Sequence, residues 1–148
     1  MARQYTTHDK FTRISNAVAA GTTDVECTAI DMQGFESVVF GIMVGAITAN
    51  AVTGAHVQQS SDNGVADAFS DLAGTAVSIA DDDDNGMVLV EVVKPQKRYV
   101  KLIIDRATQN AVVDGAFALQ YNGRKEPVTQ PVSIVATGVT YSPEEGTP

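Results

Sequence analysis

The stretch ESVVFGIMVGAI at residues 36–47 constrains the fold of this chain more than any other. It is rich in β-branched residues and apolar on both faces, which is typical of a central strand that is covered on both sides. Gly41 and Gly45 inside it predict a bulge or a close backbone neighbour. The same glycine spacing occurs where membrane helices pack, but the apolar run 38–47 is about half of the ~20 residues needed to span a bilayer.

Shorter strand patterns accompany it at intervals of roughly ten residues. The most regular is RYVKLIID at residues 98–105, in which Val100, Leu102 and Ile104 share one face. We expect this strand to be half solvated, and the four-residue connection KPQK is compatible with a hairpin to VLVEVV at residues 88–93. Further strands are predicted at VECTAI (25–30), HVQQS (56–60), TAVSIA (75–80) and AVVDGAFALQYN (111–122), and PVSIVATGVTY (131–141) is a candidate last strand.

Two of these regions raise a local question. In AVVDGAFALQYN, the alternation predicts that Val113, Phe117, Leu119 and Tyr121 share one side, with Gly115 as a bulge. Upstream, VADAFSDLAG at residues 65–74 is compatible with a short helix or with an irregular loop that buries its phenylalanine. The loop is favoured, because the segment leads directly into the next predicted strand.

Composition fits one domain of this kind. The 148 residues are 44% hydrophobic and 19% charged, which is a globular balance. Seven or eight short strands with almost no helix predict an all-β fold, an antiparallel β-sandwich of jelly-roll-like type with extended N- and C-terminal arms. We expect an N-terminal arm or edge strand at 1–23, a sandwich core at 24–125, and a proline-rich C-terminal strand and tail at 126–148. The tail prolines are Pro127, Pro131, Pro143 and Pro148.

Charge and cysteine content exclude several classes of protein. The net charge of −8 argues against direct binding of nucleic acid, which requires a basic face. Cys27, the single cysteine, excludes an intramolecular disulfide and is expected to be a small buried hydrophobe. The N-terminus has no apolar signal segment and no stretch is long enough for a membrane helix, so we expect a soluble protein made in a reducing compartment.

No motif predicts an enzyme or a cofactor site. The acidic run DDDDNG at 81–86 matches the first half of a calcium loop, but Val92 stands where a bidentate glutamate is needed. We therefore interpret Asp81–Asp84 as a solvated turn and expect no metal. His56 has no nucleophile signature near it and is interpreted as a surface or satisfied histidine. Basic residues cluster at KPQKR (94–98) and GRK (123–125), which suits either solvated loops or contact with an acidic partner.

The order of features resembles a known family. GFESVVFGIMVGAI is followed by HVQQSSDNG and AFSDLAGTAV, and, after the acidic turn, by VEVVKPQKRYVKLIIDRAT and AFALQYNGRK. This series resembles the head decoration, or cement, proteins of tailed bacteriophages, which are encoded near the major capsid protein. The resemblance covers about residues 25–125 and rests on the "QQS-D-G…F-D" stretch and the KRYVKL strand. The N-terminal arm and the tail lie outside it.

The resemblance implies a structural virion protein that binds the capsid exterior and bridges neighbouring subunits of the major capsid protein. It implies synthesis in the host cytoplasm, a homo-oligomer (dimer or trimer) on the capsid, and no membrane or direct nucleic-acid contact. The alternatives are a carbohydrate- or host-surface-binding module, which the lack of Trp disfavours, and a neck or tail component. The residues expected to contact the partner are Arg3, Tyr5, Phe11, Arg13 and Tyr141 in the arms and, as a second choice, Lys94, Lys97 and Arg98.

Overall fold

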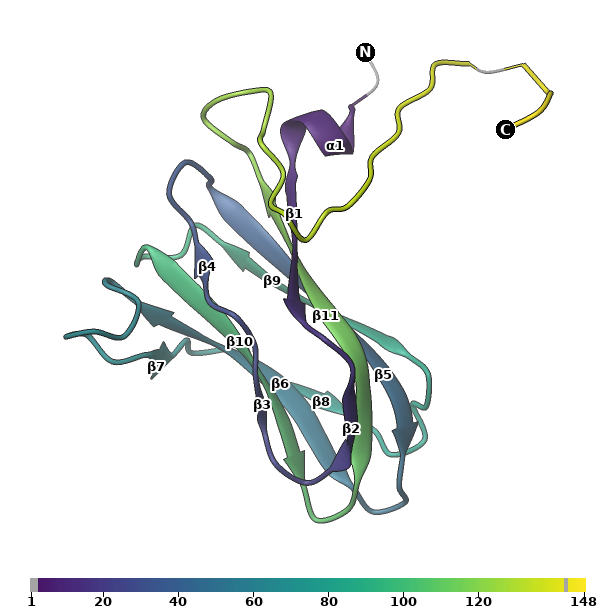
Figure 1. Ribbon diagram of the computed structural model, residues 1–148. Helices are drawn as coiled ribbons and strands as arrows, with labels where there is room; N and C mark the ends of the chain where they lie inside the picture. The colour runs from purple at the N-terminus through teal and green to yellow at the C-terminus, as the bar shows by residue number, and fades with distance from the viewer. Residues whose placement is uncertain (1–2, 143) are drawn as a thin grey trace.

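The computed structural model describes residues 3–142 and 144–148 of the chain (Figure 1). Pro143 of the tail prolines therefore lies outside the described residues, as do Met1 and Ala2. The elements are α1 (Tyr5–His8), β1 (Lys10–Ser15), β2 (Val18–Gly21), β3 (Val25–Glu26), β4 (Ile30–Asp31), β5 (Ser37–Ile47), β6 (Val52–Ser60), β7 (Ser70–Asp71), β8 (Val77–Ile79), β9 (Met87–Val93), β10 (Tyr99–Ala107) and β11 (Ala111–Tyr121). No helix among the described residues is long and apolar enough to cross a membrane.

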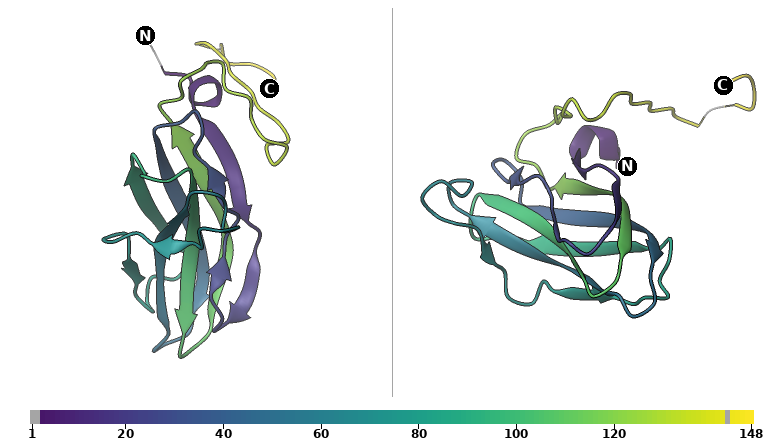
Figure 2. Two further views of the ribbon diagram at one scale, coloured as in Figure 1. Left: turned by 90° about the vertical axis from the view of Figure 1, so that its left-hand side faces the viewer. Right: turned by 60° about the horizontal axis from the view of Figure 1, so that its bottom comes forward.

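The strands form two antiparallel sheets packed face to face, which confirms the predicted all-β sandwich (Figures 1 and 2). The first, sheet A, has the order β1-β11-β5-β9, with β2 also paired to β11. The second, sheet B, has the order β3-β10-β6-β7, with β4 paired to β10 and β8 to β6. The connections β5–β6 and β10–β11 each join strands of different sheets, so neither of these consecutive pairs forms a hairpin.

The strand β5 occupies the central position that the sequence predicts. It pairs with β11 on one side and β9 on the other. The close neighbour of Gly41 is a side chain and not the predicted backbone: a Cβ added there would lie 2.3 Å from the ring of Phe117. The predicted bulge is present at Gly45, because the register between β5 and β11 shifts between Val44 and Ile47. A Cβ at Gly45 would also lie 2.9 Å from the side chains of Val112 and Asp114. Both glycines therefore make room for side chains that cross the outer face of sheet A from β11.

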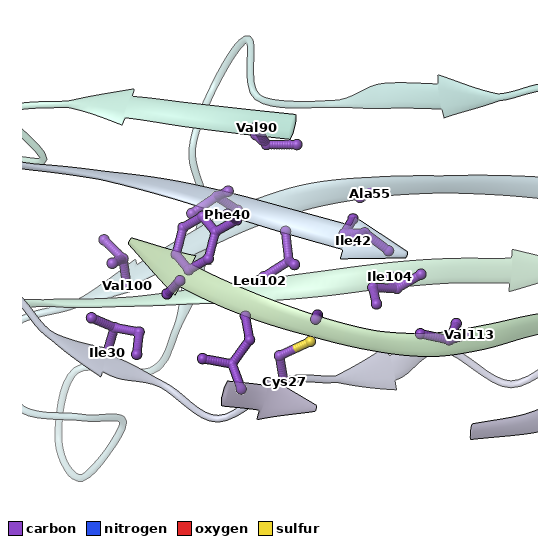
Figure 3. Packing of buried hydrophobic residues seen from close by; sticks show 14 of the residues in the cluster. Cys27, Ile30, Phe40, Ile42, Ala55, Val90, Val100, Leu102, Ile104 and Val113 are labelled. Carbon is purple, nitrogen blue, oxygen red and sulfur yellow. The ribbon is translucent and has the colours of Figure 1, made fainter. Parts of the chain in front are cut away.

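The core fills the space between the two sheets (Figure 3). Phe40 and Ile42 of β5 are fully buried, as are Leu102 and Ile104 of β10 on the facing sheet. Cys27 is also buried, and this burial raises the pKa of its thiol to about 12. A thiol with so high a pKa stays protonated and packs as a small hydrophobe, as the sequence predicts.

Two predictions are wrong, one about which strands pair and one about which side chains share a face. The strands β9 and β10 form no hairpin, because β9 pairs with β5 in sheet A and β10 with β6 in sheet B. The connection that contains Pro95 crosses from one sheet to the other. On β11, Phe117 and its outward neighbours do not share a face with Val113, which is fully buried. The register shift at Gly115 is the reason: the predicted bulge is present, and an extra residue turns later side chains to the opposite face.

Residues 65–74 form a loop and no helix, as predicted, but the prediction that the loop buries Phe69 is wrong. This side chain is half-buried outside the core, with Lys101 Nζ 4.4 Å from the centre of its ring. Only Ser70–Asp71 forms a short strand there, β7, which pairs with β6. The Asp62 carboxylate accepts backbone hydrogen bonds from residues 65, 66 and 67. The Asp67 carboxylate accepts from the Ser61 N–H at 2.8 Å and from Lys97 Nζ at 2.7 Å. Asp62 and Asp67 therefore hold the loop at residues 61–67 in one conformation, through hydrogen bonds from main-chain and side-chain donors.

Acidification is expected to release this loop before the rest of the domain unfolds. The hydrogen bond from Lys97, and then those from Ser61, lower the pKa of Asp67 from 3.8 to about 2. Because the folded-state pKa lies below the ordinary value, the stabilisation is present above about pH 4 and is lost as the pH falls towards 2. An NMR titration should show the amide signals of residues 61–67 moving in this window. Asp67→Asn should abolish the shift of the Ser61 amide signal, whose N–H donates to Asp67, while the amides of residues 65–67 still respond to Asp62, whose pKa is also lowered by their hydrogen bonds. Signals that stay fixed to pH 2 in the wild type would contradict the assignment.

The candidate last strand at residues 131–141 does not form. The segment is extended but pairs with no strand, and its one backbone bond to another described residue is a turn from the Ile134 N–H to the Pro131 carbonyl at 3.0 Å. Its start instead runs beside β1, where the Gln130 Oε1 accepts from the Phe11 N–H at 3.0 Å and the Ser133 Oγ from the Arg13 N–H at 3.4 Å. Proline at 127 and 131 removes ladder donors, which explains why side chains make these bonds.

Gly54→Ala is expected to destabilise the fold by about 1–3 kcal/mol through overpacking. A Cβ at Gly54 would lie 2.7 Å from the Val77 carbonyl oxygen, and the pairing of β6 with β8 holds that carbonyl in place. Urea denaturation measures the change. Gly138→Ala is the matched control, because no atom lies within 4 Å of a Cβ added there. Equal stability of the two variants would contradict the packing described for β6 and β8.

Candidate functional site

The two terminal segments lie together at one end of the sandwich (Figures 1 and 2). The Val128 N–H donates to the Thr7 carbonyl at 2.8 Å. The Gln130 amide nitrogen donates to the carbonyls of Thr6 at 3.0 Å and Asp9 at 2.6 Å. Beside these bonds, His8 Nδ1 lies 2.6 Å from the Glu126 carboxylate. Segments more than a hundred residues apart in the chain are thus fastened side by side.

This contact creates an exposed surface that we call the terminal patch, made of Arg3, Tyr5, Val139 and Tyr141. Tyr5 is 58% exposed and Tyr141 72% exposed, and the Gln4 amide donates a hydrogen bond to the Tyr141 hydroxyl. The patch surrounds an open cavity of about 370 Å³ between residues 3–6 and 138–141. Exposed tyrosines around a hollow are suited to contact a protein surface, since aromatic anchors dominate many interfaces.

Asp9 fixes the cationic member of the terminal patch. Its carboxylate is 1% exposed and accepts from the Arg3 Nε at 3.1 Å. This hydrogen bond is the main cause that raises the pKa of the Arg3 guanidinium. The guanidinium carbon also lies 5.9 Å from the centre of the Tyr5 ring. A buried carboxylate therefore orients Arg3 beside the aromatic ring, just before α1.

The other predicted arm residues lie next to the terminal patch, along β1. Phe11 lines a mostly apolar cavity of about 310 Å³, together with Ile134 and Ala136 of the tail. Arg13 is exposed further along the strand. Of the five arm residues that the sequence predicts, the structure thus brings Arg3, Tyr5 and Tyr141 into one patch and places Phe11 in the adjoining cavity.

The basic residues of the turn at 94–98 form ion pairs with acidic side chains of the same chain. Lys97 Nζ lies 2.7 Å from the Asp67 carboxylate. Arg98 donates two hydrogen bonds to Asp31, at 2.9 and 2.7 Å, and these lower the pKa of that carboxyl. Lys94 is 70% exposed and lies 3.8 Å from Glu36. Lys97 and Arg98 therefore form ion pairs within the chain and remain candidate contacts. Of the three, only Lys94 has a mostly exposed side chain with a distant acidic neighbour.

The acidic turn bonds to nearby backbone. Asp84 accepts from the Ile47 N–H at 2.6 Å, Asp81 from the Asn50 N–H at 2.5 Å, and Asp83 from the Ala80 N–H at 3.0 Å. Within residues 3–142 and 144–148, no three His, Cys, Asp or Glu side chains are grouped so that they would hold a metal ion. The aspartates brace the turns that surround them, which is what short acidic turns commonly do.

His56 is placed between two carboxylates. Its Nδ1 lies 2.9 Å from Asp105 and its Nε2 lies 3.3 Å from Asp71. Both ring nitrogens therefore face acidic side chains. A nucleophile–histidine pair needs one ring nitrogen free to take a proton from the nucleophile. This arrangement agrees with the interpretation of His56 as a satisfied histidine on the outer side of sheet B.

Comparison with known proteins gives structural likenesses only. No protein-family model and no curated protein matches the chain. Among solved structures, it is similar to a chain of the disulfide-linked pili of Bacillus endospore appendages, at 13% identity with a TM-score of 0.45, over 78% of this chain and 88% of that one. It is also similar to chains of the Gx and Gt strains of infectious bursal disease virus, at 13% identity with TM-scores of 0.48 and 0.41.

The viral matches cover 82% and 80% of this chain and 34% and 33% of those chains. The chain thus spans about a third of the length of the viral proteins. At these identities and TM-scores the likenesses carry no inference about function. The functional argument therefore depends on the chain's own residues and surfaces.

Proposed function

We propose that this chain is a structural virion protein that binds the outside of a phage capsid and bridges neighbouring subunits of the major capsid protein. The observation that carries the proposal is the terminal patch, where two distant chain segments present exposed tyrosines and an arginine at one end of a β-sandwich. The resemblance of residues 25–125 to phage head decoration proteins supports the choice of a capsid as the partner.

The physical logic of bridging is additive. Each copy contributes a modest contact, but a copy held by two subunits gains effective concentration for the second contact. A protein that binds only the assembled shell also stabilises that shell by mass action. Tyrosines suit this role, because they bury a large area while losing few rotatable bonds. The net charge of −8 is compatible with the exterior of a particle whose nucleic acid is inside.

The terminal patch can be tested directly by binding to phage particles from which the protein has been removed. Tyr5→Ala combined with Tyr141→Ala is expected to weaken binding at least tenfold, as loss of an interfacial aromatic anchor commonly costs about 2 kcal/mol. Removal of residues 1–8, which leaves β1 in place, should have at least as large an effect. Co-sedimentation with particles over a protein concentration series measures the affinity.

The matched control is Val52→Ala. Val52 is 60% exposed at the start of β6, near the β5–β6 loop at the opposite end of the sandwich (Figure 1). This variant should bind like the wild type, and thermal unfolding should show that all variants remain folded. Unchanged binding of the double tyrosine variant would remove the terminal patch from the interface, and failure of the wild type to bind would remove the capsid as partner.

A further inference from the structure

The edges of the two sheets differ in how they are protected. On β1, the outward N–H groups of Phe11 and Arg13 are taken by tail side chains, and the strand is bulged before Ser15. The edges of sheet B consist of β3, β4 and β7, each two residues long, and the three-residue β8. Short strands, bulges and covering segments are the devices that prevent edge-to-edge pairing.

The strand β9 has none of these devices. It spans seven residues, pairs with β5 without a register shift, and has no neighbour on its other side among the described residues. Its sequence, MVLVEVV, contains neither proline nor lysine. Met87, Leu89 and Val93 point outward and are 61%, 60% and 60% exposed. A long, regular and apolar edge strand is a site at which another strand is added.

The charges around β9 make it complementary to itself. Asp82 and its acidic neighbours lie before its first residue, and Lys94 follows its last residue with a side chain that is 70% exposed. Two copies of β9 in antiparallel alignment place the basic end of each strand beside the acidic end of the other. A parallel alignment would place like charges together, which opposes pairing.

The side-chain pattern also selects the register. Directly opposite residues on antiparallel strands point to the same face, so outward residues of one copy meet outward residues of the other. Centring the two-fold axis on Val90 sets Met87 opposite Val93 of the second copy and Leu89 opposite Glu91. Centring it on Glu91 would set two carboxylates opposite each other. The Val90 register joins apolar residues at both ends of the seam and avoids that repulsion.

We propose that β9 is a homodimer interface, in which two copies of this chain pair their β9 strands antiparallel about a two-fold axis near Val90 and join two A sheets into one. The terminal patch lies with β1, on the opposite edge of sheet A. One dimer therefore presents two terminal patches, facing away from the seam. The interface is independent of the partner that those patches bind.

A charge-swap experiment tests the interface. Sedimentation velocity of the full chain over a dilution series should show a species of twice 15.6 kDa. Met87→Lys combined with Val93→Lys places like charges opposite each other twice and should leave only monomer. Met87→Lys combined with Val93→Glu places opposite charges there and should restore the dimer. Both positions are mostly exposed in the single chain, so the fold should tolerate each pair of changes.

Val132→Lys is the control, because Val132 is fully exposed in the tail, and it should dimerise like the wild type. Wild-type chain that stays monomeric at every concentration would overturn the proposal. So would a dimer that survives the two lysines, because the contact would then lie elsewhere. A dimer lost on removal of residues 135–148 alone would assign the contact to the tail and would equally overturn it.

Discussion

Replacing Phe40 with alanine is expected to lower the free energy of unfolding by about 3–5 kcal/mol. Phe40 is 0% exposed at the centre of β5 and is among the largest side chains that are fully buried in the described chain. Its ring packs between the sheets, close to Val100 and Leu102 of β10 (Figure 3). The cavity left by the ring would remove contacts from both layers, and paired strands on either side prevent β5 from moving inward to fill it.

Urea denaturation followed by circular dichroism measures this loss. Val132→Ala is the control, since a fully exposed tail side chain should change stability by no more than about 0.5 kcal/mol. A loss below about 1 kcal/mol for Phe40→Ala would mean that the two sheets do not enclose this side chain as described. That result would contradict the packing of the sandwich.

Replacing Arg106 with methionine is expected to cost about 3 kcal/mol. Arg106 is 5% exposed, and its guanidinium donates to the carbonyls of Thr23 at 2.7 Å, Ala19 at 2.9 Å and Ala111 at 2.7 Å. Its backbone N–H donates to Asp24 at 3.0 Å. Methionine has a similar length but no donor. Three carbonyls would lose their partner: those of Ala19 and Thr23, where the chain passes from β2 in sheet A to β3 in sheet B, and that of Ala111 at the start of β11.

The same denaturation experiment measures this change, and hydrogen exchange should show faster opening of residues 19–24. Arg124→Met is the matched control, because Arg124 is exposed and its bond to the Gly34 carbonyl comes from the backbone. Equal stability of the two methionine variants would mean that the Arg106 hydrogen bonds do not stabilise the connection between β2 and β3.

Local pattern predicts the long strands of the sandwich, but not their partners, and it predicts a strand at 131–141 that does not form. The β-branched run at 36–47 identified β5, and the alternation of Val100, Leu102 and Ile104 identified the buried face of β10. The four residues that include Pro95 are enough for a hairpin, yet they are also enough to step between sheets. On β11 the sequence predicts the bulge at Gly115, but simple alternation across the bulge assigns Phe117 to the wrong face.

In the candidate site, too, the sequence predicts individual residues but not the long-range contacts that join them. Tyr5 and Tyr141 were predicted as separate contacts because they are aromatic residues in polar arms. Nothing local predicts that they meet, since Gln130 makes the connection through carbonyls of residues 6 and 9. The buried Asp9 and Arg106 were missed for a similar reason. Charged residues are normally exposed, and only the long-range partners explain why these two are buried.

The proposed role on a phage capsid is tested most directly by asking whether purified phage particles contain this chain. Quantitative gel analysis should find the protein at a copy number close to that of the major capsid protein, and cryo-electron microscopy should place its density on the outer surface, across seams between subunits. The end that carries Tyr5 and Tyr141 should face the shell. Particles without the protein, or with about a dozen copies at the neck, would contradict the proposed role.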